Sequence, residues 1–114
     1  MKIKWLGHSS FLLQDSMGRT LLTDPFDGTV GYKVFQDKVD SITISHNHFD
    51  HNYTKNVKYS HVIDKRGFFN PDGISIVGIP SYHDKVKGAK RGKNIIFVIE
   101  MDNYRICHLG DIVY

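Results

Sequence analysis

The six residues His46-Asn47-His48-Phe49-Asp50-His51 give the clearest indication of the fold, because they bring three histidines and one aspartate together. They directly follow the run 42–45, Ile-Thr-Ile-Ser, whose alternation of apolar and polar residues is typical of a short β-strand. In extended backbone, side chains two residues apart point the same way, so His46 and His48 can bind one cation. Asp50 and His51 come further along, as the chain bends, and can bind a second cation beside it. Imidazole and carboxylate groups are metal ligands, so the pattern predicts a metal site and not a packing role.

Short strands separated by turn residues are expected on both sides of this motif. Apolar and alternating runs predict strands at 3–5, 11–13, 19–23, 42–45, 74–79, 94–100 and 104–109. The lysines around Ile3 and Trp5 indicate that the first strand is half-buried. Turns are predicted at 16–18 and, as a tight hairpin, at 101–103. A weak apolar period predicts one helix at 53–59. The expected class is α/β, rich in β-strands.

Residue types that bind metals recur just beyond four of the predicted strands. Asp24 and His46 directly follow their strands, whereas His83 and Asp111 follow theirs by a few residues. Residues just beyond strand ends lie on loops held by a rigid sheet, where open sheets usually bind ligands. Polar residues are common after strands in general, so a single position would carry little weight. Four such positions together predict one site at one edge of a sheet.

Length and composition bound the class of protein. With 114 residues, 40% of them hydrophobic and 24% charged, the chain is expected to be one globular domain. A single cysteine, Cys107, excludes a disulfide framework and indicates a reducing compartment. The longest strongly apolar run, 95–99, is far too short to span a membrane, and the N-terminal residues do not resemble a signal peptide. A cytoplasmic location without a membrane partner is therefore expected.

A basic segment before the strand 94–100 leaves two interpretations open. Its basic residues are Lys85, Lys87, Lys90, Arg91 and Lys93. The segment is either a solvated loop or a positive rim that attracts an anionic substrate. The net charge of +3 is too small to indicate nucleic acid binding, and the segment has no interleaved aromatic residues for base stacking.

The pattern His-x-His-x-Asp-His after an apolar strand resembles the signature of the metallo-β-lactamase fold superfamily. The rest of the chain resembles its bacterial branch related to ascorbate-6-phosphate lactonase, whose members are metal-dependent hydrolases. Four further segments carry this resemblance: Trp5-Leu6-Gly7-His8-Ser9-Ser10-Phe11, Thr23-Asp24-Pro25-Phe26, Arg91-Gly92-Lys93-Asn94 and His108-Leu109-Gly110-Asp111. The fold that the resemblance implies is the β-rich half of an αββα sandwich, in the α/β class.

The resemblance also implies a ligand set for two divalent metal ions. The implied ligands are, for the first metal, His46, His48 and His83, for the second, Asp50 and His51, and for both, Asp111. Asp24 would orient a ligand histidine through its far ring nitrogen. Asp50 is implied as the catalytic residue that orients a bridging hydroxide, which would attack carbon or phosphorus. Zinc is the preferred ion, with manganese and iron as alternatives, because all three accept imidazole and carboxylate ligands.

The chain departs from this superfamily in length. Its members are built from two similar halves, and the last histidine ligand of the second metal comes from the second half. Here the chain stops at Asp111-Ile112-Val113-Tyr114, directly after the implied bridging aspartate. Residues 1–114 are therefore expected to be a single truncated domain, an N-terminal half that pairs with a second half, a partner chain or another copy of itself.

Three functions remain open at this stage. The first is a metal-dependent hydrolase that uses a metal-bound hydroxide on a small ester, lactone or phosphoester. The second is a non-catalytic metal-binding fragment that needs a second half or a partner chain. The third and least favoured is ribonuclease-like processing of nucleic acid, because 114 residues leave no room for the RNA-binding segments of such enzymes.

The remaining histidines and the cysteine are expected to be structural. His61 has no acidic or histidine neighbour at ligand spacing and is predicted to lie on the surface, and His8 is predicted to be structural or to support the site. His108 alternates with Ile106, so it is predicted to be a hydrogen-bonded, partly buried histidine. Cys107 faces the other side of that strand and is predicted to be a small core residue.

Overall fold

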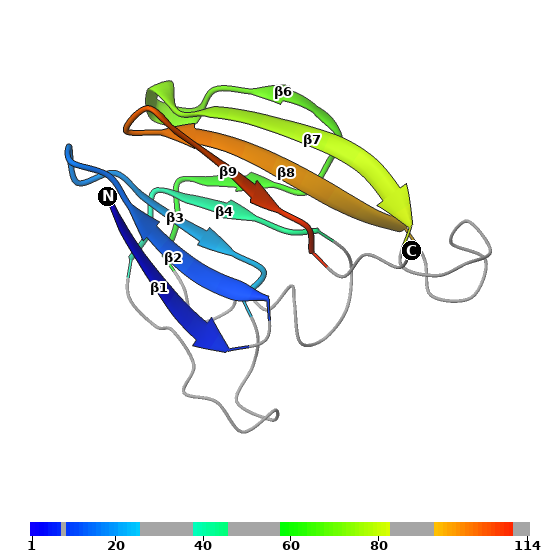
Figure 1. Ribbon diagram of the computed structural model, residues 1–114, viewed down its shortest axis with the longest axis horizontal. Helices are drawn as coiled ribbons and strands as arrows, with labels where there is room; N and C mark the ends of the chain where they lie inside the picture. The colour runs from blue at the N-terminus through cyan, green and yellow to red at the C-terminus, as the bar shows by residue number, and fades with distance from the viewer. Residues whose placement is uncertain (8, 26–37, 46–57, 83–92, 111–114) are drawn as a thin grey trace.

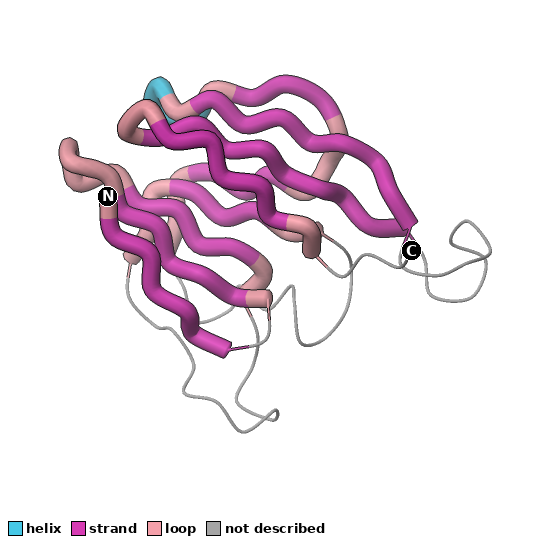
Figure 2. Tube along the Cα trace, in the orientation of Figure 1, coloured by secondary structure: helices cyan, strands magenta, loops and turns pink. Residues whose placement is uncertain are grey.

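The computed structural model describes residues 1–7, 9–25, 38–45, 58–82 and 93–110. Within these residues the chain forms two β-sheets that face each other, as Figures 1 and 2 show. A short 3-10 turn, η2 (Pro71–Gly73), precedes one strand of the second sheet. No helix in this part of the chain is long and apolar enough to cross a membrane. The β-rich architecture expected from the sequence is confirmed.

The first sheet has five strands in the order β1-β2-β3-β4-β5. The strands are β1 (Lys2–Gly7), β2 (Ser10–Gln14), β3 (Thr20–Thr23), β4 (Ser41–Thr43) and β5 (His61–Ile63). β1, β2 and β3 pair antiparallel, whereas β3, β4 and β5 pair parallel. Because parallel strands run in one direction, the carboxyl ends of β3 and β4 meet at the same edge of the sheet.

The second sheet has four antiparallel strands in the order β6-β7-β8-β9. The strands are β6 (Gly67–Phe69), β7 (Ser75–Tyr82), β8 (Lys93–Met101) and β9 (Tyr104–His108). At the turn between β8 and β9, Asp102 and Asn103 have φ angles of 51° and 65°. Positive φ at both central residues fits the twist of a hairpin, and Asp and Asn tolerate it better than most residues. The hairpin predicted at 101–103 is confirmed.

The core lies between the two sheets. Its buried side chains are Leu13, Leu21 and Ile63 from the first sheet and Ile74, Ile76, Phe97, Ile99 and Met101 from the second sheet and the residue before it. The opposite face of the first sheet is also apolar, because Leu22 and Ile42 are fully buried in a second cluster with Val39. Successive residues of a strand point to opposite faces, so Leu21 and Leu22 serve the two clusters. The central strands β3 and β4 are therefore buried on both faces, as is usual for parallel strands.

Two strands were missed in the sequence, and the predicted helix is only partly testable. β5 and β6 have three residues each that do not alternate between apolar and polar, and they are defined by pairing with β4 and β7. The predicted helix at 53–59 lies outside the described residues except at its end. Lys58 there is not helical, because it forms a parallel β-bridge with Lys38.

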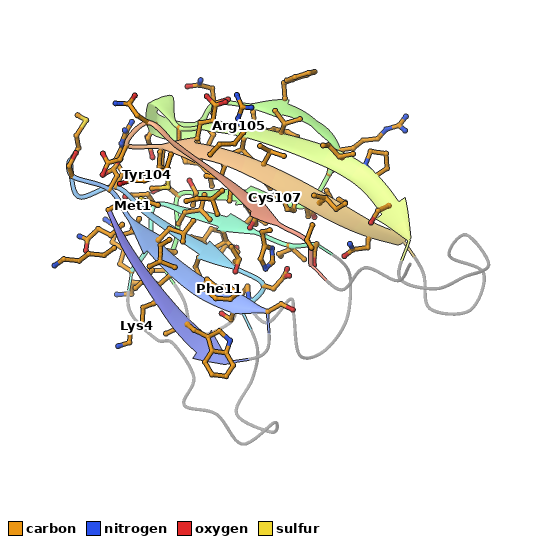
Figure 3. All side chains as sticks on the ribbon, viewed as in Figure 1. Met1, Lys4, Phe11, Tyr104, Arg105 and Cys107 are labelled. Atoms are coloured by element: carbon orange, nitrogen blue, oxygen red, sulfur yellow. The ribbon has the colours of Figure 1, made fainter. Side chains whose placement is uncertain are left out.

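Two predictions about burial were wrong. The first strand was expected to be half-buried, but its apolar residues Ile3 and Trp5 are 58% and 57% exposed because β1 is the outermost strand of its sheet. Cys107 was expected in the core, but it is exposed on β9, the outermost strand of the second sheet (Figure 3). Alternation along β9 turns Ile106 and His108 toward the core and leaves Cys107 on the other side.

Candidate metal centre

The six ligands implied by the sequence lie outside the described residues. They are His46, His48, Asp50, His51, His83 and Asp111. The residues that directly precede their three segments, Ser45, Tyr82 and Gly110, are described. The structure therefore gives the framework from which the three ligand segments depart, and the ligand set itself stays a prediction.

The strands that lead into these segments end on one side of the molecule. In Figure 1 the arrows of β3, β4, β7 and β9 point toward the same end. The backbone N–H of Ile95, at the start of β8, donates to the carbonyl oxygen of Ser45 at 2.8 Å, so the end of the first sheet is bonded to the second. Ser45, the residue before His46, is thereby held against β8.

Asn94 ties the other two departure points together. Its side-chain amide donates to the hydroxyl of Ser81 at 3.0 Å and to the carbonyl oxygen of Leu109 at 2.8 Å, and Asn94 is fully buried. Ser81 lies two residues before His83, and Leu109 lies two residues before Asp111. A buried amide that makes two bonds of this kind holds both chain segments at fixed positions.

Gly110 packs directly against two of these residues, Asn94 and Ser45. A Cβ atom on Gly110 would lie 2.4 Å from Asn94 Oδ1 and 2.6 Å from the hydroxyl oxygen of Ser45. Its φ angle of +64° is also one that residues with a side chain rarely adopt. The backbone before Asp111 therefore passes directly beside the residue before His46, and only glycine fits there.

Asp24 is the buried carboxylate at the centre of this framework. It directly follows β3, is 0% exposed, and has a φ angle of 40°, in the left-handed region. Its Oδ1 accepts a hydrogen bond from the backbone N–H of Ser45 at 2.7 Å, and its Oδ2 accepts one from the Ser45 hydroxyl at 2.6 Å. Asp24 thus fixes the residue that precedes the histidine motif. The predicted bond from Asp24 to a ligand histidine involves residues outside the described part and stays a prediction.

His108 approaches Asp24 from the second sheet. It is 8% exposed, its Nε2 lies 2.8 Å from the carbonyl oxygen of Ser9, and its Nδ1 lies 3.9 Å from Asp24 Oδ2. Nδ1 is buried and has no hydrogen-bond partner. Phe11 packs edge-on against the imidazole, with ring centroids 6.0 Å apart. The prediction of a hydrogen-bonded, partly buried histidine is confirmed, and its approach to Asp24 is new.

The connection between β1 and β2 belongs to the same framework. The carbonyl oxygen of Ser9 also accepts a bond from the hydroxyl of Thr23 at 2.8 Å, and that hydroxyl in turn accepts one from the N–H of Phe11 at 2.8 Å. The hydroxyl of Ser9 donates to the carbonyl oxygen of Gly110 at 3.3 Å. Residues near the N-terminus are thus bonded to the residue before Asp111.

The other histidines do not join this framework within the described residues. His61 is on the surface, as predicted, with Nε2 at 3.7 Å from Asp72 Oδ2. His8 lies outside the described residues. In the part of the chain that the structure describes, no three histidine, cysteine or acidic side chains stand together as a metal site would require.

An apolar cavity of about 220 Å³ opens between β1 and β9, at the edge of the two sheets. It is lined by Ile3, Phe11, Leu13, Thr23, Ile99, Ile106, Cys107 and His108. Its walls come from both sheets, so the space between the sheets is not fully closed on this side by the described residues.

Comparison with known proteins connects this framework to a family. Residues 2–114 match the family model described as the beta-lactamase superfamily domain. The chain is 28% identical, over 144 aligned positions, to a UPF0173 metal-dependent hydrolase of Archaeoglobus fulgidus, with 97% of this chain and 61% of that protein covered. It is 38% identical to a candidate Zn-dependent hydrolase of the metallo-β-lactamase superfamily from Thermotoga maritima, whose crystal structure matches with a TM-score of 0.74.

The match to the Thermotoga maritima structure covers 96% of this chain and 48% of that one. A second solved structure, a candidate metal-dependent hydrolase of Parabacteroides distasonis, has a TM-score of 0.76 at 20% identity and shows the same fold. The chain spans between about half and three-fifths of the length of these relatives, since 48%, 60% and 61% of them are covered. From the family match and the two facing sheets, the chain belongs to the beta-lactamase superfamily and carries the β-rich half of the metallo-β-lactamase fold.

Proposed function

We propose that this chain provides the metal-binding half of a metal-dependent hydrolase that acts on a small ester, lactone or phosphoester. The observation that carries the proposal is the convergence of Ser45, Asn94 and Gly110 at one end of the two sheets. The implied ligands follow these anchors directly in the chain. The names of the relatives, which are described as metal-dependent hydrolases, support the same activity.

The proposed ligand set follows the resemblance of the histidine motif. The proposed ligands are His46, His48 and His83 for the first metal, Asp50 and His51 for the second, and Asp111 for both. Divalent metal ions in such a site supply a nucleophile at neutral pH and stabilise the negative charge that develops on the substrate. Asp50 would orient the attacking water, and zinc is the preferred ion, because the Thermotoga maritima relative is described as Zn-dependent.

The described residues fit a metal centre of this kind. Asp24 is a fully buried carboxylate, and both of its oxygens hold Ser45, which precedes the motif. Metal-ligating residues are usually held in place by such outer hydrogen bonds. Gly110 also passes close to Ser45, so the residues directly before His46 and Asp111 lie side by side.

For the substrate, the sequence indicates a negative charge but does not choose between an ester, a lactone and a phosphoester. Most of the basic segment, Lys85 to Arg91, lies outside the described residues, so its position relative to the site stays a prediction. A positive rim there would favour an anionic substrate. The ascorbate-6-phosphate lactonase branch and the cytoplasmic location likewise remain predictions.

The proposal is tested by the metal content of the chain and of two histidine variants. Protein purified without chelators and dialysed against zinc and manganese is analysed by plasma mass spectrometry. We expect His48→Ala to hold at least one metal ion fewer than the wild-type chain, because a site that loses one ligand binds its metal much more weakly. His61→Ala is the matched control, since His61 is an exposed histidine elsewhere on the molecule.

Metal content that is unchanged in His48→Ala would contradict the proposed ligand set. Chromogenic ester, lactone and phosphoester substrates, each with and without added metal, then test the hydrolase activity itself. Turnover that persists undiminished in His48→Ala would exclude a mechanism that depends on this centre.

A second candidate function is favoured by the exposed edge of the molecule. Ile3 and Trp5 on β1 are more than half exposed, and Ile3 also lines the apolar cavity. A chain with such an edge is suited to binding another protein surface. In this proposal the chain binds metal but needs a second half, or another copy of itself, before it is catalytic.

A further inference from the structure

We propose that His108 is a positioning residue of the metal centre, which acts through Asp24 and Ser45 on the histidine motif. The inference rests on the proposed function for its link to metal, but its structural part concerns described residues alone. His108 lies on β9, Asp24 follows β3, and Ser45 follows β4, so the three residues join both sheets at the end where the motif starts.

The orientation of the imidazole is fixed by Ser9. A carbonyl oxygen only accepts hydrogen bonds, so the Nε2 atom of His108, 2.8 Å from the carbonyl oxygen of Ser9, carries a hydrogen. The same oxygen accepts a bond from the hydroxyl of Thr23, so both of its lone pairs are used. Phe11 packs edge-on against the ring. Because the bond to Ser9 and the contact with Phe11 fix the ring, its other nitrogen, Nδ1, points in one direction only.

Nδ1 of His108 faces the carboxylate of Asp24. When both ring nitrogens carry a hydrogen, the imidazolium is attracted to this carboxylate, although the 3.9 Å between Nδ1 and Oδ2 is too long for a hydrogen bond. A buried polar atom without a bond is destabilising, and Nδ1 has none. A shift of about 1 Å would convert the approach into a charge-assisted hydrogen bond. The pair is therefore placed to hold Asp24 in one orientation.

Asp24 in turn holds Ser45, the residue directly before the histidine motif. Its two oxygens accept bonds from the N–H and the hydroxyl of Ser45, at 2.7 Å and 2.6 Å. A rotation of the carboxylate would weaken both bonds together, because they use different oxygens. Ser45 is bonded directly to His46 along the chain, so a loosened Ser45 would leave the first ligand pair less well placed.

Three substitutions of His108 separate the possible roles of its ring. His108→Phe keeps the size and the contact with Phe11 but removes both nitrogens. His108→Gln has an amide that reaches as far as Nε2 and can still donate to Ser9. His108→Asn has an amide near the position of Nδ1 and can still donate to Asp24. A space-filling role predicts that Phe suffices, a bond to Ser9 predicts that Gln suffices, and the proposed role predicts that Asn suffices.

The first measurement is zinc affinity, by competition with a chromophoric chelator. We expect His108→Phe and His108→Gln to bind zinc about tenfold or more weakly than wild type, and His108→Asn to recover most of the loss. In an Asp24→Asn background, His108→Phe should cause no further loss, because His108 acts through Asp24. Three results would overturn the proposal. They are a zinc affinity that is the same in all three single variants, a zinc affinity that Gln but not Asn restores, and losses of affinity that add in the double variant.

The second measurement needs no metal, so it separates this inference from the proposed function. The amide hydrogen of Ser45 is bonded to Asp24, whereas that of Ile74 is bonded to the carbonyl oxygen of Pro71, in another part of the fold. In metal-free protein, His108→Phe should speed hydrogen exchange at Ser45 about tenfold while Ile74 stays unchanged, and His108→Asn should restore protection. Unchanged exchange at Ser45, or equal acceleration at both amides, would overturn the positioning role. Wild-type protein that binds no divalent metal would instead overturn the proposed function.

Discussion

Single residues at the candidate metal centre are packed so closely that small changes in size become functional changes. Gly110 is the clearest case, because it combines a positive φ angle with a side-chain position that Asn94 and Ser45 already occupy. Neither neighbour moves freely, since Asn94 is bonded to Ser81 and Leu109, and Ser45 is bonded to Asp24. Strain at this glycine would therefore be transmitted to the chain on both sides of the site.

We predict that Gly110→Ala destabilises the protein and weakens metal binding together. The unfavourable φ angle alone costs about 1–2 kcal/mol, and the overlap with Asn94 and Ser45 adds about 1–3 kcal/mol. Gly18→Ala is the control, because Gly18 has a φ angle of +83° but nothing within 4 Å of its Cβ position. Urea unfolding and zinc competition measure the two effects. If Gly110→Ala costs no more stability than Gly18→Ala, the close packing around Gly110 is not rigid.

At the scale of single residues, only part of the framework of this centre could be predicted from the sequence. Asp24 could be predicted as functional because an aspartate directly follows a strand, and its burial and bonds to Ser45 agree with a supporting role. The link between His108 and Ser9 spans 99 positions in the chain, so no local pattern could reveal it. Cys107 was misplaced for a related reason, because alternation gives two faces of a strand but does not say which one meets the core.

Among the elements, the turn between β2 and β3 is held by one buried carboxylate. Asp15 accepts bonds from the N–H groups of Met17 and Arg19 at 3.0 Å and 2.8 Å, and from Arg19 Nε at 2.6 Å. Burial by itself would raise the pKa of Asp15, but the hydrogen bonds and the charge of Arg19 together hold it below its ordinary value of 3.8. Asp15 thus favours the folded state in its ionised form.

We predict that this turn makes the protein sensitive to acid. A carboxyl with a pKa lowered by folding contributes its full stability above the ordinary value of 3.8 and loses it as the pH falls through the lowered one. Asp15→Asn should cost about 1–3 kcal/mol at neutral pH, and the difference from wild type should shrink as acid is added. Urea midpoints over a pH series measure this, with Asp64→Asn on an exposed loop as control. A difference that stays constant with pH would show that the charge of Asp15 is not what matters.

How much of the elements the sequence could predict depended on their length and their turns. β7 and β8 were found because they are long, and β9 because Asp102 and Asn103 mark a hairpin before it. β5 and β6 were missed because their three residues do not alternate, whereas the equally short β4 was found from the alternating run 42–45; pairing with β4 and β7 defines them. Local patterns therefore sufficed for runs that alternate or flank a hairpin turn, whereas β5 and β6 depend on pairing with a neighbouring strand.

At the scale of the whole molecule, the two sheets are joined at both ends by different chemistry. At the end near the N-terminus, the Asp102 carboxylate of the β8–β9 turn accepts bonds from the N–H and hydroxyl of Ser16 and pairs with the N-terminal amine of Met1 at 3.3 Å. At the other end, Asp24, Ser45, His108 and Asn94 form the framework of the candidate centre. The side between β1 and β9 has the apolar cavity instead, so this side is where the fold is least closed within the described residues.

This open side predicts self-association of the chain. Ile3 is 58% exposed on β1 and lines the cavity of about 220 Å³, and exposed apolar surface of this kind favours contact with another protein. β1 and β9 are both outermost strands, so a second copy can cover apolar side chains and unpaired strand edges at once. Light scattering over a concentration series should show a dimer that forms as the protein concentration rises. Ile3→Lys should shift it to monomer, because a lysine there would be buried at the contact, whereas Met17→Lys, at an exposed position on the β2–β3 turn, should not. A wild-type chain that stays monomeric would contradict self-association and would favour a different protein, such as a second half of the fold, as the partner.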